Sequence, residues 1–326
     1  MTLPYVLRLL CLCLAAFFVV HALLGLLMSV VSHAAIRVAE KMRPRSGARL
    51  LLFVRFLPPA LGLAAVLALC IPSYLWFEPQ SIPERVGWVC LTLVLLAVAT
   101  LSVSFARGLR ALGASRRFNS RWRQLGRLAH LSRDHSNAVI VEKQAPLLVL
   151  AGVFRPRLFI SDGVLRALTA EELEAALKHE NVHRFSRDNL KRLLLVLSPQ
   201  ALPFLSGFAR LEESWAELSE WAADDEAVQG DSNRALSLAT ALLRFARLGA
   251  GPRPSFLHTS LVAGDGHLCA RVDRLLHLER PGAEPVPRSR DLVLGGGIGV
   301  TVCALILAAG PAVPSCVYRF LELLLR

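Results

Sequence analysis

Residues 169–183 of this 326-residue chain read TAEELEAALKHENVH, and this segment is the starting point for predicting the domain around it. The first four letters form a capping box. The Thr169 hydroxyl can accept a hydrogen bond from the backbone N–H of residue 172, and the Glu172 carboxylate can reach back to residue 169. Apolar residues then recur at Leu173, Ala176 and Leu177, the spacing of one helix face. The sequence therefore predicts a helix that begins after Thr169 and packs one side against a core.

The end of the same helix carries the pattern HExxH, as His179, Glu180 and His183. Side chains four residues apart project from one face of a helix, so both imidazoles can bind a single Zn²⁺ ion. The Glu180 carboxylate can then accept a proton from a metal-polarised water and act as a general base. The alternative is a helix with two incidental surface histidines, and the capping box and the strand-like segment before it argue against that.

A catalytic zinc ion needs three protein ligands and one open position. No third histidine follows at the spacing HxxGxxH, so we expect a downstream carboxylate as the third ligand. The predicted helix over 211–228 carries acidic residues that fall within ~60° of one another around its axis. They are Glu213, Glu217, Glu220 and Asp224. Such a stripe is either a solvated face or the source of the third ligand, and a nearby metal cation favours the second.

Strand-like runs precede the metal-binding helix at residues 138–142, 147–151 and 157–160, with glycine and proline between them. An extended peptide substrate could pair with the second or the third run by adding a strand to the sheet. Strands followed by helices indicate one α+β domain, which we place at residues 137–290.

Residues 193–211 form a further apolar stretch of borderline length for a membrane span. Pro199 and Pro203 interrupt it. A single crossing there would also put the HExxH helix and the acidic helix on opposite sides of the membrane, where their side chains could not meet at one ion. We therefore expect packed core, or an interfacial segment on the membrane surface.

Outside this domain the chain is strongly apolar. Of all residues 54% are hydrophobic, and the mean hydropathy is +0.48. This content excludes a disordered protein, and an odd count of 7 cysteines, most of them in apolar runs, excludes a disulfide-rich secreted scaffold. Helices long enough to cross a hydrocarbon core are predicted at residues 9–31, 57–77, 86–106 and 292–309.

The chain carries 37 Lys and Arg against 25 Asp and Glu, a net charge of +12. Basic residues crowd segments 37–49 and 107–127, whereas the loop between the second and third spans is nearly neutral. Because positive loops stay in the cytoplasm, we expect both termini outside the cell and residues 107–290 inside. The position of the basic segments next to spans makes anionic lipid headgroups of the bilayer their expected partner, and no direct nucleic-acid binding is expected.

These boundaries divide the chain into five parts. They are three spans with a basic cytoplasmic loop (1–106), a basic juxtamembrane segment (107–136), the zinc domain (137–290), a fourth span (291–311) and a short extracytoplasmic tail (312–326).

Two motifs together resemble those of a known class of enzyme: HExxH at 179–183, followed by Glu-x-x-Ala-Asp, present as EWAAD at 220–224. The combination looks like the integral-membrane gluzincins. GVFRPRLFIS at 152–161 and RDNL at 187–190 are similar to the beta-lactam sensor-transducer (antirepressor) metallopeptidases, to which heat-shock and CAAX-type membrane zinc proteases are related. The resemblance covers nearly the whole chain. It implies an α-helical multi-pass protein of the bacterial inner membrane with an inserted α+β cytoplasmic gluzincin zinc-protease domain.

The resemblance also implies a role for each matching residue. Glu180 would be first base and then acid, and Asp224, one turn after Glu220, would orient a zinc-binding imidazole, that of His179. One Zn²⁺ ion would be bound by His179, His183 and Glu220, with Glu217 as the rival third ligand.

Further candidates have weaker support from the sequence. Asp188 resembles a family position with a structural role, and capping of a helix or an ion pair fits it equally well. No motif identifies the group that stabilises the oxyanion, for which the candidates are His258, His267 and Arg271.

The implied activity is hydrolysis of peptide bonds in a cytoplasmic or membrane-associated protein, and the family resemblance implies a DNA-bound repressor as that substrate. Two alternatives remain: a membrane quality-control protease, and a non-catalytic membrane scaffold or signalling partner, against which an intact Glu180 argues. The antirepressor receptors carry a large sensor domain after the fourth span, and residues 310–326 are too few for one. We therefore expect any activating signal to come from another protein, the bilayer or the spans.

Overall fold

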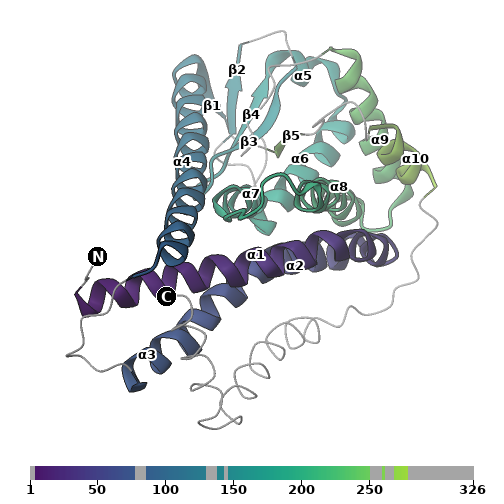
Figure 1. The fold of residues 1–326 in the computed structure, drawn as a ribbon. Coiled ribbons are helices and arrows are strands. Elements are labelled where there is room, and N and C mark those ends of the chain that lie inside the picture. The colour runs from purple at the N-terminus through teal and green to yellow at the C-terminus, as the bar shows by residue number, and fades with distance from the viewer. Residues whose placement is uncertain are drawn as a thin grey trace.

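The structure is a computed structural model, and Figure 1 shows its arrangement: two long apolar helical stretches lie on one side, and a third rises from them along a small sheet that shorter helices cover. It describes residues 4–77, 86–129, 138–142, 146–249, 259–260 and 268–277. The predicted fourth span and the tail lie outside these residues.

Three helical stretches are long and apolar enough to cross a membrane, as the sequence predicts. The first is α1 (Tyr5–Glu40). The second consists of α2 (Pro44–Ala65), the π-helical turn η1 (Val66–Cys70) and α3 (Ile71–Phe77). The third is α4 (Trp88–Leu125).

These helices continue beyond the predicted spans. α1 ends at Glu40 and α2 begins at Pro44, so the expected basic loop is mostly helix with a tight turn at residues 41–43. The basic juxtamembrane segment, expected as a part separate from the third span, is mostly a continuation of the same helix, because α4 extends to Leu125. Gly108, Ser115 and Trp122 are buried along α4 at seven-residue spacing, which is one helix face. This face packs on the α+β domain, and the arginines of the segment occupy the rest of the helix surface.

The sheet has five strands in the order β1-β2-β4-β3-β5. The three runs expected from sequence are β2 (Ala138–Val141), β3 (Leu148–Ala151) and β4 (Arg157–Ser161). β2 and β4 are parallel, and the other pairs are antiparallel. The outer strands are β1 (Gly126–Ala129), which sequence analysis missed, and β5 (Thr259–Ser260).

The sheet order corrects the expected docking of a substrate strand. β4 lies between β2 and β3, and β3 lies between β4 and β5. Val149 and Leu150 of β3 are paired with β5, so the edge of β3 that faces away from β4 is already paired there with another strand of the same chain. A strand needs an unpaired edge to accept another one. Neither of the two expected strands therefore offers an open edge along these residues.

Two apolar layers cover the sheet. On one face, Phe118 and Trp122 of α4 pack against Phe159 and its neighbours. On the other face, a larger core joins the sheet to the helices that follow it. These helices are α5 (Asp162–Ala167), α6 (Ala170–Ser186), α8 (Ser206–Val228), α9 (Ser232–Arg247) and α10 (Leu268–Leu276). The domain is α+β, as expected.

The apolar stretch 193–211 is not one continuous helix. α7 (Asp188–Leu197) ends before Pro199, and α8 begins at Ser206, so the two prolines lie in the break between them. Leu195 and Leu211 belong to a core cluster with Ala39 of α1 and Leu51 of α2. The expectation of packed core is confirmed.

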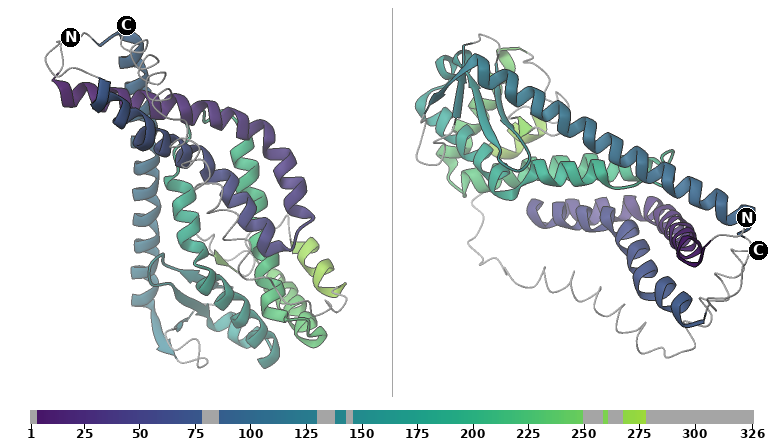
Figure 2. Two further views of the ribbon diagram at one scale, coloured as in Figure 1. Left: turned by 90° about the horizontal axis from the view of Figure 1, so that it is seen from below. Right: turned by 90° about the vertical axis from the view of Figure 1, so that its left-hand side faces the viewer.

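α1 and α2 run side by side beneath α7 and α8 (Figures 1 and 2). The start of α8 lies against the middle of α1, where a Cβ on Gly207 would come within 2.5 Å of the Ser29 hydroxyl. Only a glycine permits so close an approach. His21 of α1 contacts the carbonyl of Pro199, with 3.2 Å between Nε2 and O. The helices that follow the sheet are therefore built directly onto the apolar helices.

Candidate metal centre

The local structure that begins the HExxH helix is the one expected from its sequence. The Glu172 N–H donates to the Thr169 hydroxyl at 3.3 Å, and the Thr169 N–H donates to the Glu172 carboxylate at 2.9 Å. Both halves of the capping box are present, and α6 starts at Ala170. Ala176 and Leu177 lie in the main core. The face of α6 that carries the two histidines is thereby fixed toward α8.

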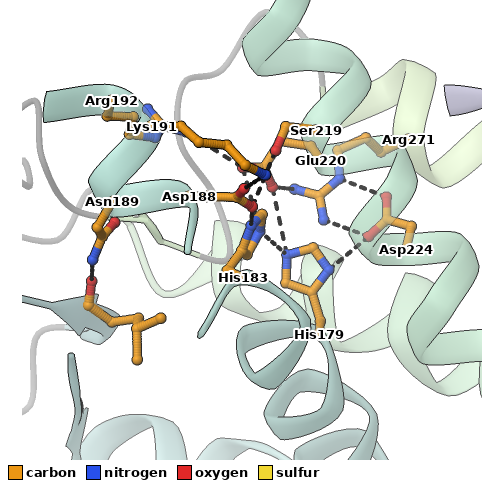
Figure 3. A network of polar contacts seen from close by, with 11 residues as sticks. His179, His183, Asp188, Asn189, Lys191, Arg192, Ser219, Glu220, Asp224 and Arg271 are labelled. Atoms are coloured by element: carbon orange, nitrogen blue, oxygen red, sulfur yellow. Dashed lines mark hydrogen bonds and ion pairs between the residues drawn. The ribbon is translucent and has the colours of Figure 1, made fainter. Parts of the chain in front are cut away.

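Three potential metal ligands converge there, namely His179 and His183 from α6 and Glu220 from α8 (Figure 3). Their ligand atoms all lie within 4.8 Å of one another, and all three residues are buried. The two Nε2 atoms are 3.1 Å apart. Glu220 places one oxygen 3.5 Å from Nε2 of His179 and the other 3.6 Å from Nε2 of His183.

The three residues are placed around one point. Glu220 faces His179 with one oxygen at 3.5 Å and His183 with the other at 3.6 Å, and one ligand atom from each of the three residues lies within 4.8 Å of the other two. Ligand atoms on one tetrahedral ion at 2.0–2.2 Å lie about 3.3–3.6 Å apart, so binding an ion would draw these atoms closer together. One Nε2–H group can donate to the other Nε2 across 3.1 Å, and with both protons absent the two nitrogen lone pairs can instead share a cation. The donor set of this site therefore suits a metal ion.

Glu180 lies beside the cluster and is completely buried. Neither of its carboxylate oxygens has a hydrogen-bond partner among the residues that the structure describes. Burial raises the pKa of this carboxyl, and the neighbouring histidines oppose the shift. A buried carboxyl without a partner is costly to the fold, so its presence next to potential metal ligands indicates a chemical role.

The structure distinguishes between the acidic residues of α8. Glu220 and Asp224, one helical turn apart, are buried and face α6. Glu217 is half-buried and Glu213 is exposed, and neither belongs to the ligand cluster. Of the two possible third ligands, the fold therefore brings Glu220 to the histidines.

Each imidazole has a carboxylate behind it. Asp224 Oδ1 lies 2.9 Å from His179 Nδ1, the contact that the family resemblance implies. Asp188 Oδ2 lies 2.7 Å from His183 Nδ1, a partnership that sequence analysis did not assign. Arg187, with φ of 55°, ends α6 and lets the chain turn back so that Asp188 reaches the helix it has just left. A carboxylate at Nδ1 leaves Nε2 free to face a metal.

Asp188 is itself held on both oxygens. The Lys191 ammonium donates to Oδ1 at 2.6 Å, and the Ser219 hydroxyl of α8 donates to Oδ2 at 3.2 Å. The hydrogen bond from His183 and the ammonium of Lys191 outweigh burial and lower the pKa of Asp188 to about 2. The expected ion pair is present, and it adds to the orientation of His183.

The field of these carboxylates favours positive charge at the centre. Burial alone lowers the pKa of His183, but Glu220 and Asp188 outweigh it and raise that pKa to about 10. The pKa of Glu220 is well below its usual range because burial is outweighed by His183 and His179. In the metal-free protein His183 therefore holds a proton that a divalent cation would replace.

Arg271 of α10 lies behind the ligands. Its Nε and Nη2 donate to the two oxygens of Asp224 at 2.9 and 2.7 Å, and Nη1 lies 3.2 Å from Glu220. This candidate for oxyanion stabilisation is thus in the cluster, with its guanidinium directed at the two α8 carboxylates (Figure 3). The other two candidates, His258 and His267, lie outside the described residues.

A cavity of about 270 Å³ opens on the His183 side of the cluster, lined by Leu150, Phe154, Leu190 and Arg187 among others. Asn189 also lines this cavity, and its side-chain amide donates to the carbonyls of Leu150 and Gly152 at 2.9 and 2.8 Å. This link joins α7 to the end of β3. Asn189 belongs to the sequence segment RDNL, but its long-range partners could not be identified without the fold.

Comparison with known protein-family models finds no match to this chain, and comparison with curated proteins finds none either. The function is therefore argued from the geometry of the centre.

Proposed function

We propose that this protein is a zinc-dependent membrane endopeptidase that hydrolyses peptide bonds on the cytoplasmic side. One observation supports it above the others: two histidines and a glutamate converge on one point, and a buried, unpartnered Glu180 lies directly beside them. This is the composition of a hydrolytic metal centre, with three protein ligands and an adjacent base.

Zinc is the metal we propose. Two imidazole nitrogens and one carboxylate suit Zn²⁺, and a site with three protein ligands leaves a coordination position for water and substrate. Hard cations such as Mg²⁺ and Ca²⁺ prefer sites made of oxygen ligands. The carboxylates of Asp224 and Asp188 fit this proposal, because they hold each imidazole with Nε2 toward the ion.

When bound, zinc would polarise the scissile carbonyl and lower the pKa of a water molecule toward ~7. Glu180 would accept a proton from that water and pass it to the leaving amine. Its raised pKa suits the second step, in which the carboxyl must act as an acid. Arg271 would hold Asp224 and Glu220 in place while the charge at the centre changes.

The proposed substrate is a cytoplasmic or membrane-associated protein, with a DNA-binding repressor as the specific candidate. The cavity beside His183 gives a substrate side chain a place next to the ligands. Three apolar helices of span length keep the centre close to a membrane. In our proposal this is the bacterial inner membrane, with the centre on the cytoplasmic side.

The test uses the full chain purified in detergent. Its zinc content and its cleavage of an unfolded protein such as casein are measured for wild type, Glu180→Gln and Glu174→Gln. Glu180→Gln should keep zinc and lose activity by about 10²–10⁴-fold, the usual contribution of a general base. Glu174 lies on the same helix with a 67% exposed side chain, and its substitution should change neither property.

Two outcomes count against the proposal. Equal activity of wild type and Glu180→Gln would show that hydrolysis, if any, comes from elsewhere. Stoichiometric zinc with no cleavage of casein or of co-expressed repressors by wild type would favour the non-catalytic scaffold.

A further inference from the structure

The apolar helices gather four free cysteines at one end. Cys11 and Cys13 lie on α1, Cys70 ends η1, and Cys90 lies near the start of α4. The Sγ atoms of Cys13 and Cys70 are 3.8 Å apart, which is direct contact between two sulfur atoms 57 residues apart in the chain. The other two thiols belong to the same apolar cluster.

The backbone beside this pair is unusual. In η1 the N–H of Ile71 bonds to the carbonyl of Val66, five residues earlier, which is a π-turn inside an otherwise α-helical stretch. A π-turn within an α-helix is a recognised cause of kinks, so it changes the direction of the side chains at its end. Cys70 is that end, and it is 2% exposed against α1. Such turns are rare and occur frequently at functional sites.

We propose that Cys13 and Cys70 form a reversible redox pair, which closes to a disulfide between α1 and the second apolar helix. The oxidant is a small disulfide. Cys13 is half-buried whereas Cys70 is buried, so the Cys13 thiolate attacks first. It forms a mixed disulfide and releases one small thiol. The Cys70 thiolate then attacks the Cys13 sulfur, and the second small thiol leaves.

This exchange balances in atoms and electrons. Two cysteine thiols and one small disulfide give one protein disulfide and two small thiols. The protons of the cysteines end on the released thiols, and two electrons pass to the small disulfide. In the membrane orientation proposed above, this end of the helices faces the outside of the cell, where disulfides persist. The pair does not depend on the metal centre, so each proposal can fail without the other.

The test uses the full chain in membranes, with oxidised glutathione as the probe. After oxidation the protein is denatured, and its remaining thiols are labelled with a maleimide polymer and counted by gel shift. Wild type should lose two labels and regain them with dithiothreitol. Cys13→Ser should lose none, and Cys70→Ser should stop at a mixed disulfide, with one label lost and glutathione retained in the intact mass. Cys11→Ser and Cys90→Ser are matched controls and should still lose two.

Peptide mapping of oxidised wild type tests which helices are joined, and mapping of Cys11→Ser separates Cys13 from Cys11, because both lie in the same tryptic peptide. Trypsin should release peptide 9–37 joined to peptide 56–85, with peptide 86–107 unlinked. Full labelling of wild type after oxidation would overturn the proposal. So would a link to peptide 86–107, a link between two chains, or label loss that persists in the Cys13→Ser/Cys70→Ser double variant.

Discussion

Each imidazole of the metal centre is oriented by a carboxylate from a different part of the chain. Asp224 of α8 holds His179, and Asp188, the first residue of α7, holds His183. Glu220 then faces both Nε2 atoms from α8. The ligands are thus fixed before any ion binds, which reduces the cost of assembling the site.

Glu220→Ala should abolish stoichiometric zinc binding because it removes one of three protein ligands. Glu217→Ala, three residues earlier on the same helix, should leave zinc bound, since Glu217 lies outside the ligand cluster. Zinc content after dialysis against a weak chelator measures both. Zinc retained by Glu220→Ala but lost by Glu217→Ala would reverse the assignment.

Zinc affinity should increase with pH. In the metal-free protein the pKa of His183 is raised from 6.5 to about 10, so its imidazole binds a proton that zinc must displace. Affinity should therefore rise by up to about tenfold per pH unit between pH 6.5 and 10, as expected for release of one proton. Titration calorimetry in buffers of different ionisation enthalpy measures that release.

The raised pKa of His183 also makes the stability of the metal-free protein depend on pH, but stability falls with rising pH whereas zinc affinity increases. A raised pKa stabilises the fold fully below 6.5, and the contribution is lost as pH rises through about 10. Zinc affinity that does not change with pH would contradict a protonated His183.

Among the contacts between α2 and α8 are Arg–Glu pairs of very different burial. Arg55 is 1% exposed, donates to Glu212 at 2.8 Å and to the Ser198 hydroxyl at 2.8 Å, and lies over the ring of Phe208. Arg45 pairs with Glu226 at 3.1 Å, with side chains 62% and 51% exposed. The pairs therefore form a matched comparison between the same two helices.

Arg55→Met should lower the free energy of unfolding by about 3–5 kcal/mol, because it leaves Glu212 and Ser198 without their partner. Arg45→Met should change it by less than about 1 kcal/mol, as is usual for exposed pairs. Thermal unfolding in detergent, followed by tryptophan fluorescence, compares the two. Equal losses would mean that burial of Arg55 does not matter to the contact between α2 and α8.

Elements with strong local signals were predicted correctly. The capping box places the start of α6, and runs of β-branched and apolar residues place β2, β3 and β4. The elements that were missed depend on distant partners. β1 has no strand pattern of its own and forms by pairing with β2, and the end of α4 is ordered by contact with the sheet.

The α+β part that carries the candidate metal centre forms one structural unit with the apolar helices. Phe208, Trp215 and Leu218 of α8 pack against α1 and α2. Residues 107–290 expressed alone should therefore expose this face, aggregate and fail to bind zinc, because a large apolar patch would meet water. Co-expression of residues 1–106 as a separate chain should restore soluble, zinc-binding material in detergent.

Size-exclusion chromatography and zinc content provide the measurement. A monomeric, zinc-binding domain from residues 107–290 alone would show that the contact with α1 and α2 is dispensable.

Local features follow from the sequence alone: the helix that presents two histidines on one face, the break at Pro199 and Pro203, and the apolar stretches of span length among the described residues. These depend on periodicity, capping and proline, which act over a few residues.

The packing of the elements selects the acidic residue that completes the cluster, places Asp188 behind His183 and brings Cys13 to Cys70. It also closes the edge of β3 with β5. Each of these is a contact between residues distant in the chain or on separate elements, and such contacts are set by how helices and strands pack. Local sequence patterns carry no direct record of that packing.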